Sequence, residues 1–317
     1  MWGRSSSFTT AVWLSRSCWR RWTSTAERYR SVVRHHIVPT WGTWRLGSIA
    51  HSDVAAWVAS LSDQGLRPGS VRQIHRVLSL IMDAAVLDGR IGRNPARDVK
   101  MPRQVRGEPR CLSVAEVTRL AEAADQDAGL VLVLAFTGLR FGEAAGLRVR
   151  RIDVERRRLE VCEILTEIGG VLVPGTPKTH QRRSVPVPRS LMPVLYEACR
   201  GKDSEGWVFT SPEGHALRLR NWRARVFDPA CQAAQLRGVT PHDLRHTAAS
   251  LAIQNGANVK VVQRMLGHAS AAMTLDVYAG LFRDDLDNVA DALDRVVPQM
   301  CHIEVAEQAA EDDEPDA

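Results

Sequence analysis

Hydrophobic side chains recur at helical spacing three times in the first hundred residues. Residues 25–37, 51–65 and 70–89 each place apolar side chains three or four positions apart, which is the spacing of one buried face of an α-helix. Ser52 is the expected N-cap of the second helix, and Gly65 marks its end. The pattern predicts a small helical bundle in the N-terminal part of the chain.

A linker separates this bundle from a second region. Residues 91–110 hold three prolines and many arginines, a composition that favours an irregular connection. Ser113 and Glu116 then carry the signature of a capping box at a helix start. A strongly apolar helix follows and is expected to end at Gly138.

Three short β-rich runs come next, at residues 157–165, 169–174 and 183–188, separated by Gly, Pro and Thr. They predict one small antiparallel sheet. Helical patterns return from Ser190 and continue to about Val296. The chain is therefore expected to be mainly α, with a small antiparallel β-sheet that makes its second region α+β.

Charge is distributed unevenly along the chain. Residues 1–104 carry 16 Lys and Arg against 6 Asp and Glu, whereas residues 301–317 carry none against 7. A basic region suggests a polyanionic partner, although a solvated face of arginines has the same composition. The acidic end predicts a disordered tail.

Several protein classes are disfavoured by composition. The six cysteines are scattered without a CxxC pair, which argues against zinc and a disulfide framework and fits a reducing cytoplasm. No run of 18 apolar residues occurs, so no membrane span is expected. Residues 1–23 are rich in Trp, Ser and Arg, like a transit peptide without a clear cleavage pattern. A non-native or truncated start fits them as well, and they are left unassigned.

The stretch VTPHDLRHTAAS, residues 239–250, holds candidate anion ligands at a predicted helix start. His242 and Arg245 lie three positions apart, on one face of the first turn. Free backbone N–H groups at a helix N-terminus favour an anion, so this stretch predicts a phosphate site. His242 and His246 are an alternative pair of metal ligands, but no third ligand is evident.

Other cations occur in two separate stretches. TGLRFGEAAGL places Arg140 after the apolar helix, where an ordinary surface arginine at a helix start is an equal alternative to a functional one. TPKTHQRRSVPVP places Lys178 in the expected tight connection between two strands, followed by Arg182 and Arg183. A lysine there is often only solvated, but the two arginines make a nearby DNA phosphate plausible.

The stretch LGHASAAMTLDVY brings a histidine and a tyrosine together. His268 follows a helix-breaking glycine, and Tyr278 is one of three tyrosines in the chain. Taken alone, Tyr278 would be expected to bury its ring in a helix.

These residue types together indicate one chemistry. Arginine binds phosphate oxygens in a bidentate manner and stabilises charge in a transition state. Nearby cations lower the cost of a tyrosine phenolate, which then becomes a nucleophile. A lysine can protonate a departing alkoxide. The product would be a phosphotyrosine ester, formed without a metal or another cofactor.

The motifs in this order resemble those of the tyrosine recombinase, or phage integrase, family. The likeness lies in TGLRFGE, PKTHQRRSVPVP, HDLRHTAAS and LGHASAAMTLDVY, and HHIVPTWGTWRLGSIAHSDV is typical of the family's core-binding domain. It implies that Arg140, His242 and Arg245 activate the scissile phosphate. It further implies that Lys178 is the general acid, that His268 supports the phosphate, that Tyr278 is the nucleophile, and that Glu143 is an accessory acid.

The resemblance also implies an architecture and partners. Residues 24–104 would form a helical, SAM-like core-type DNA-binding domain, and residues 105–300 the tyrosine recombinase catalytic domain, with residues 301–317 as the tail. The expected activity is site-specific cleavage and rejoining of DNA, which integrates or excises a phage or mobile element. The expected partners are double-stranded DNA with recombination sites, other copies in a homotetramer, and a directionality or bending factor. A chromosome-dimer resolvase, a transposon recombinase and a DNA-binding protein without catalysis remain alternatives.

Overall fold

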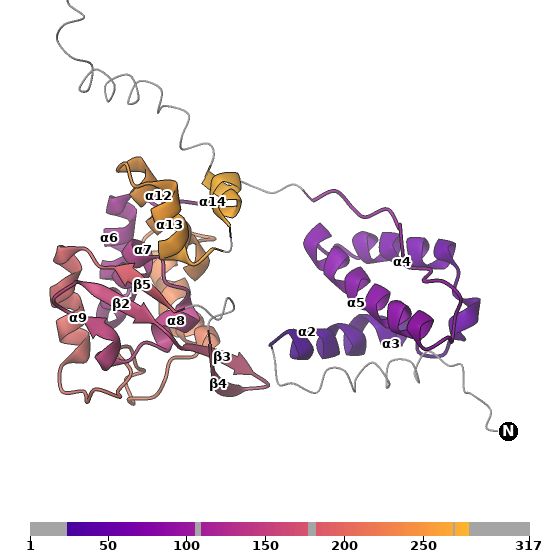
Figure 1. Ribbon diagram of the computed structural model, residues 1–317, viewed down its shortest axis with the longest axis horizontal. Helices are drawn as coiled ribbons and strands as arrows, with labels where there is room; N and C mark the ends of the chain where they lie inside the picture. Colours follow the sequence, from indigo (N-terminus) through magenta and orange to yellow (C-terminus); the bar gives the residue numbers. More distant parts are fainter. Residues whose placement is uncertain (1–23, 105–108, 177–181, 269, 279–317) are drawn as a thin grey trace, which may run out of the picture.

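The computed structural model describes residues 24–104, 109–176, 182–268 and 270–278 (Figure 1). Helices predominate and the strands are short, as the sequence predicts. Within the described residues, no helix is long and apolar enough to cross a lipid bilayer.

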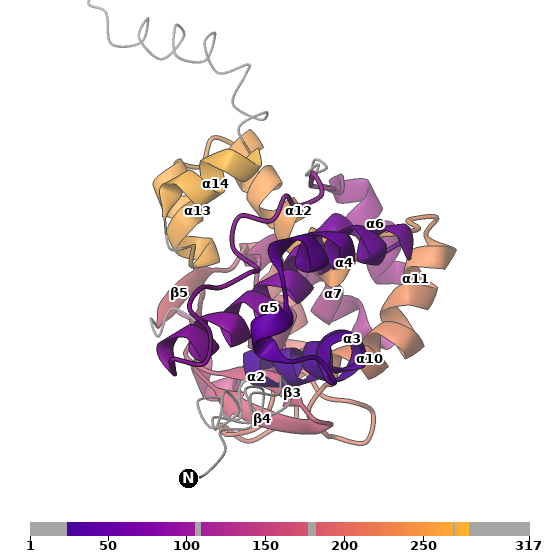
Figure 2. The ribbon, with the colours of Figure 1, turned by 90° about the vertical axis from the view of Figure 1, so that its right-hand side faces the viewer.

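The elements named in the N-terminal region, residues 24–104, are helical. They are α2 (Ser24–Val32), a π-helical turn (Val33–Ile37), α3 (Val38–Trp41), a 3₁₀-helical turn (Leu46–Ser48), α4 (His51–Asp63) and α5 (Pro68–Leu87). The first predicted helix is therefore present but is interrupted by the π-helical turn. Figure 2 shows α4 and α5 from a second direction.

Helix α4 begins two residues earlier than the sequence predicts. Its N-cap is Ala50, and Ser52 lies inside the first turn. The backbone N–H of Ala50 donates a hydrogen bond of 2.9 Å to Oδ2 of Asp53. A carboxylate in the first turn also interacts favourably with the positive end of the helix dipole, so Asp53 rather than the Ser52 hydroxyl stabilises this start.

Helix α5 supplies much of the N-terminal core. Pro68 occupies the first turn, where its missing N–H has no cost. Buried side chains then recur at helical spacing, among them Val71, Ile74, Leu78 and Ile81. They belong to a hydrophobic cluster that also contains the tryptophans of α3 and α4.

The second region combines helices and short strands. Its helices are α6 (Val114–Ala123), α7 (Ala128–Thr137), α8 (Phe141–Ala145), α9 (Met192–Cys199), α10 (Leu219–Trp222), α11 (Asp228–Ala233), α12 (Pro241–Gln254), α13 (Val259–Leu266) and α14 (Ala271–Tyr278). Its strands are β1 (Ile152–Asp153), β2 (Arg158–Val161), β3 (Ile164–Ile168), β4 (Val171–Gly175) and β5 (Arg183–Pro186).

The strands form two separate sheets, where the sequence predicts one. Strands β1, β2 and β5 make a three-stranded antiparallel sheet, and β3 pairs with β4 in an antiparallel hairpin. In the first sheet Leu159 of β2 lies opposite Val185 of β5, and both are fully buried. Consecutive strands β4 and β5 therefore do not pair with each other.

Helix α7 lies at the centre of the second core. Leu130 and Leu134 are almost completely inaccessible, and the helix packs against α6 and α12. An α-helix that is apolar on all sides is expected to be buried. This cluster is separate from the N-terminal one, and α12 and α13 contribute side chains to it.

Candidate active site

Arg140 lies at the turn between α7 and α8. The turn is possible because Gly138 adopts a left-handed conformation, with φ of +66°. A Cβ atom at Gly138 would also come within 2.8 Å of the Leu266 side chain. The Arg140 side chain remains 44% exposed while Nη1 donates a hydrogen bond of 2.9 Å to Glu143. It is therefore held from one side and accessible from the other.

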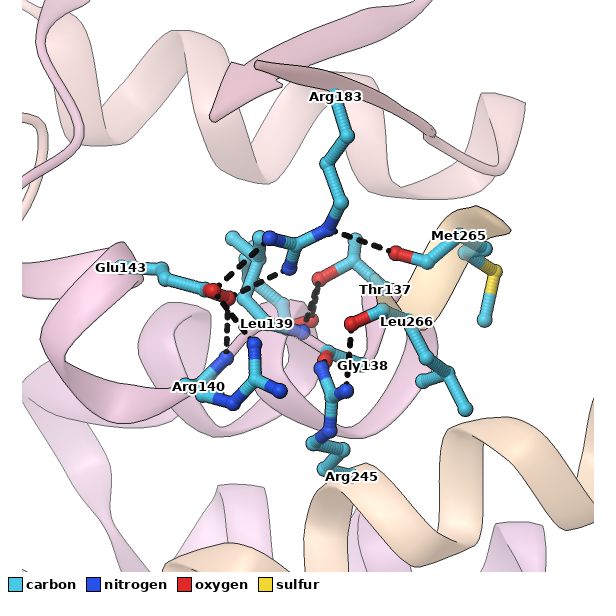
Figure 3. A network of polar contacts seen from close by, with 10 residues as sticks. Thr137, Gly138, Leu139, Arg140, Glu143, Arg183, Arg245, Met265 and Leu266 are labelled. Carbon is cyan, nitrogen blue, oxygen red and sulfur yellow. Dashed lines mark hydrogen bonds and ion pairs between the residues drawn. The ribbon is translucent and has the colours of Figure 1, made fainter. Parts of the chain in front are cut away.

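Arg245 is buried on α12, with 2% of its surface exposed. Nη1 donates to the carbonyl oxygen of Gly138 (2.6 Å) and Nη2 to that of Leu266 (2.5 Å) (Figure 3). Burial, together with the charge of Arg140, lowers the pKa of Arg245 to about 9, so it stays a cation at neutral pH. Its two bonds join the segment that precedes Arg140 to the segment that precedes His268.

A buried carboxylate accompanies these arginines. Arg183 of β5 donates to both oxygens of Glu143, over 2.8 and 2.6 Å, and its Nε donates to the carbonyl oxygen of Met265 (2.9 Å) (Figure 3). Burial alone would raise the pKa of Glu143, but the hydrogen bonds and charge of Arg183, followed by those of Arg140, hold that pKa below its usual value. Glu143 is thus an anion shared by two arginines.

The two arginines predicted to bind DNA have different surroundings. Arg182 is exposed, as a phosphate ligand requires. The Arg183 side chain is only 10% exposed and directs its donors to a carboxylate and a carbonyl oxygen. The donors of Arg183 are therefore engaged within the protein in this structure, and a direct DNA contact by Arg183 stays a prediction.

His242 and His246 lie one turn apart on α12, and their rings meet edge to face at 4.8 Å between centroids. His242 is the more exposed of the two. Partial burial and then the charge of Arg245 lower the pKa of His242. Nδ1 of His246 lies 2.8 Å from the hydroxyl oxygen of Tyr278.

His268 directly follows the end of α13. Gly267 ends that helix in a left-handed conformation, as predicted. Nδ1 of His268 lies 3.0 Å from the hydroxyl oxygen of the buried Thr274. Burial, then the charges of Arg245 and Arg140, lower the pKa of His268 to about 4. Its imidazole is therefore neutral at pH 7.

Tyr278 is the last residue of α14 in the described part of the chain. It is 2% exposed, so the expectation that its ring would be buried holds. Burial and then the neighbouring Cys111 raise the pKa of its hydroxyl, while Arg245 opposes them. The phenol keeps its proton in this state, and its hydroxyl has His246 as a partner.

Lys178 lies in residues 177–181, outside the described residues. The segments that flank it are β4, which ends at Gly175, and β5, which begins at Arg183. These two strands belong to different sheets and do not pair with each other.

The described candidates therefore come together from distant parts of the chain. Arginine cations, neutral imidazoles and a phenol are suited to bind a phosphodiester and attack its phosphorus. Sequence reasoning did not identify the partners of Arg183 and Tyr278. The spacing of His242 and His246, four residues apart on one helix, was the available signal that His246 also faces this region.

The sequence is similar to a protein-family model and to named integrases and recombinases. A model of the "phage integrase family" matches residues 110–283. The chain is 27% identical over 285 residues to the ICEBs1 integrase of Bacillus subtilis (strain 168), covering 84% of this chain and 77% of that one. It is 28% identical over 254 residues to the tyrosine recombinase XerC of Vibrio vulnificus (strain YJ016), covering 77% of each.

Solved structures share the fold. The Tn1549 transposon integrase in complex with a circular intermediate DNA matches with a TM-score of 0.77 at 20% identity, over 92% of this chain and all of that one. A lambda integrase dimer bound to a core site matches with a TM-score of 0.64 at 20% identity, over 87% and 95%. Together with the matched motifs, the family model identifies the chain as a member of the phage integrase family, the tyrosine-type site-specific DNA recombinases.

Proposed function

We propose that this recombinase integrates or excises a phage or other mobile element through a 3′-phosphotyrosine intermediate. The relatives named for such elements, the ICEBs1 integrase and the Tn1549 transposon integrase, support this choice. The similarity to XerC supports a second candidate, resolution of chromosome dimers, by the same chemistry.

The observation that carries the proposal is the position of Arg245. Its two hydrogen bonds, to the carbonyl oxygens of Gly138 and Leu266, join three motifs that lie far apart in the sequence. Each bond is made by a charged donor inside the protein, where such bonds are strong. This preorganisation supports a site that stabilises charge on a phosphate without first rearranging.

The proposed roles follow from charge and position. Arg140, Arg245 and His242 bind the non-bridging oxygens of the scissile phosphate, and Glu143 holds Arg140 in place. His268, neutral at pH 7, donates a hydrogen bond to the same phosphate. The hydroxyl oxygen of Tyr278 attacks the phosphorus.

The chemical steps conserve the phosphodiester bond energy. A bond forms between the Tyr278 oxygen and phosphorus while the bond to the 5′ oxygen breaks. Lys178 gives its proton to the departing 5′ oxygen. A 5′ hydroxyl of another strand then attacks the phosphotyrosine, which releases Tyr278 and completes the exchange without a nucleotide triphosphate.

DNA would be held by both regions of the chain. The basic residues 1–104 and the exposed Arg182 provide phosphate contacts, which release counterions and make affinity fall with salt. A homotetramer on two duplexes, passing through a Holliday junction, is the assembly we propose. A directionality or DNA-bending factor would act at this assembly.

The decisive experiment is covalent trapping. A nicked duplex from the DNA that flanks the gene loses a short 5′-terminated fragment after cleavage, so the protein–DNA adduct accumulates and is seen on a denaturing gel. Tyr278→Phe should bind this DNA and form no adduct, because only the hydroxyl is removed. Tyr196→Phe is the matched control, since Tyr196 is 58% exposed.

The result also separates the enzyme from a DNA-binding protein without catalysis. Wild-type protein that binds the duplex without any adduct would favour the latter. An adduct that persists in Tyr278→Phe would assign the nucleophile to another residue and reject the roles given above.

A further inference from the structure

Tyr278 has a hydrogen-bond partner that none of the roles above uses. Nδ1 of His246 lies 2.8 Å from the Tyr278 hydroxyl oxygen, and the two rings meet at 60° with centroids 5.8 Å apart. Because Tyr278 is 2% exposed, bulk water has little access to its hydroxyl. The proton that must leave before or during attack on phosphorus therefore has His246 as its nearest acceptor among the described side chains.

The surroundings of His246 favour a neutral imidazole. Partial burial lowers the pKa of His246, and His242 and Arg245 on the same helix lower it further, while Asp243 opposes them. Only a neutral imidazole can accept a proton. The arrangement therefore keeps His246 in the form that a base requires.

The other groups near this pair come from two further segments. Cys111, ahead of α6, places its thiol 3.7 Å from the backbone oxygen of His246, and its proximity raises the pKa of Tyr278. His268, after α13, is close enough for His246 to affect its pKa. His268 bonds to Thr274 through Nδ1, whereas His246 bonds to the nucleophile itself.

We propose that His246 is the general base for Tyr278. With its own proton on Nε2, its Nδ1 accepts the phenolic proton as the Tyr278 oxygen bonds to phosphorus and the 5′ oxygen departs with the bonding electrons. During rejoining the imidazolium returns this proton to the tyrosine oxygen as the phosphotyrosine bond breaks. The inference rests on the proposed function, and it adds a residue outside the set that the motifs assign.

A purely orienting hydrogen bond is the competing explanation, and His246→Asn distinguishes the two. The amide oxygen of asparagine lies near the position of Nδ1 and accepts a hydrogen bond, but it takes up no proton near neutral pH. His246→Asn should bind DNA as wild type does and form the covalent adduct about 10²–10⁴-fold more slowly, the usual contribution of a general base. His215→Asn, an exposed histidine outside the site, should form it at the wild-type rate.

Two further readouts would not respond to a merely structural role. The wild-type cleavage rate should decline in acid as His246 becomes protonated, and this decline should be weaker in His246→Asn. Imidazole in the buffer should restore part of the rate of His246→Ala. An adduct formed by His246→Asn at the wild-type rate would overturn the proposal.

The tautomer can be tested without DNA. Nitrogen-15 chemical shifts of the His246 ring should show a proton on Nε2 and an unprotonated Nδ1 that accepts from Tyr278. A proton on Nδ1, donated to the tyrosine oxygen, would overturn the base role whatever DNA the enzyme cleaves. The proposed function is tested independently of this tautomer, because it is rejected if the wild-type protein forms no covalent adduct with DNA.

Discussion

Arg183 and Glu143 form a two-point ion pair in which neither side chain is more than 10% exposed. The pair joins β5 to the start of α8, and the third donor of Arg183 reaches the carbonyl oxygen of Met265 near the end of α13. The segments that carry Arg140 and His268 are therefore linked through a side chain that is only 10% exposed (Figure 3).

Adjacent arginines should consequently have different effects when replaced by alanine. Arg183→Ala leaves the buried Glu143 carboxylate without its main partner, and breaking such a pair costs about 3–5 kcal/mol of unfolding free energy. Arg182→Ala should change the unfolding free energy by less than about 0.5 kcal/mol and weaken DNA binding. Urea unfolding and DNA titration of both variants measure this. Equal stability of the two variants would contradict the role given to Arg183.

Substitution by alanine should lower the free energy of unfolding more at Gly138 than at Gly65, another glycine in a left-handed conformation. Gly65 and Gly138 both have positive φ, but a Cβ at Gly65 meets no atom within 4 Å. Gly65→Ala should cost only the left-handed strain, about 1–2 kcal/mol. Gly138→Ala should cost about 1–3 kcal/mol more through crowding against Leu266.

The rate of DNA cleavage should also differ between the Gly138→Ala and Gly65→Ala variants. The carbonyl of Gly138 accepts a hydrogen bond from Arg245, so displacement of this turn should slow adduct formation at temperatures where the variant is folded. Gly65→Ala should cleave at the wild-type rate. A Gly138→Ala protein with normal cleavage would show that the turn tolerates the shift.

The lowered pKa of His268 predicts that acid destabilises the fold. The pKa is about 4 in the folded protein, against an ordinary value of 6.5, so the unfolded chain binds more protons between these values. Stability from this group is complete above pH 6.5 and is lost as the pH falls toward 4. Urea midpoints between pH 7 and 4.5 should fall less steeply in His268→Gln. An unchanged slope would contradict the assignment.

Lys178 can be tested through the leaving group. If it protonates the departing 5′ oxygen, Lys178→Ala should cleave an ordinary nicked duplex slowly. It should recover most of its rate on a duplex with sulfur at that bridging position, because a thiolate leaves without a proton donor. Arg245→Ala should not recover. Equal deficits of Lys178→Ala on both substrates would limit Lys178 to phosphate binding and make His242 or His268 the better acid.

Much of the architecture follows from local patterns. The capping box of Ser113 and Glu116 forms as expected, and Gly138 and Gly267 end their helices in left-handed conformations. These features depend on a few neighbouring residues, whose spacing and backbone preferences are visible in the sequence. The order of the motif residues, together with the chemistry of each side chain, was likewise sufficient to identify the family.

Other features depended on contacts through space. The pairing of β2 with β5, and of β3 with β4, divides one predicted sheet into two, because strand pairing depends on which distant segments meet. At the start of α4, Asp53 rather than Ser52 bonds to the first free N–H, since two nearby side chains compete for it. In both cases the alternative strand pairings or hydrogen-bond partners have similar local energies, and contacts with other parts of the fold select between them.

For single side chains too, some properties follow from the sequence and others only from the tertiary structure. The sequence by itself predicted that Arg140, Arg245, His268 and Tyr278 belong to one chemistry, because residue type and motif order carry that information. Only the tertiary structure decided that Arg183 faces a carboxylate 40 positions away and that His246 meets a tyrosine 32 positions away. The partner of a charged or polar group depends on which side chains the folded core brings within hydrogen-bonding distance, and burial makes that partner the dominant influence on its pKa and reactivity.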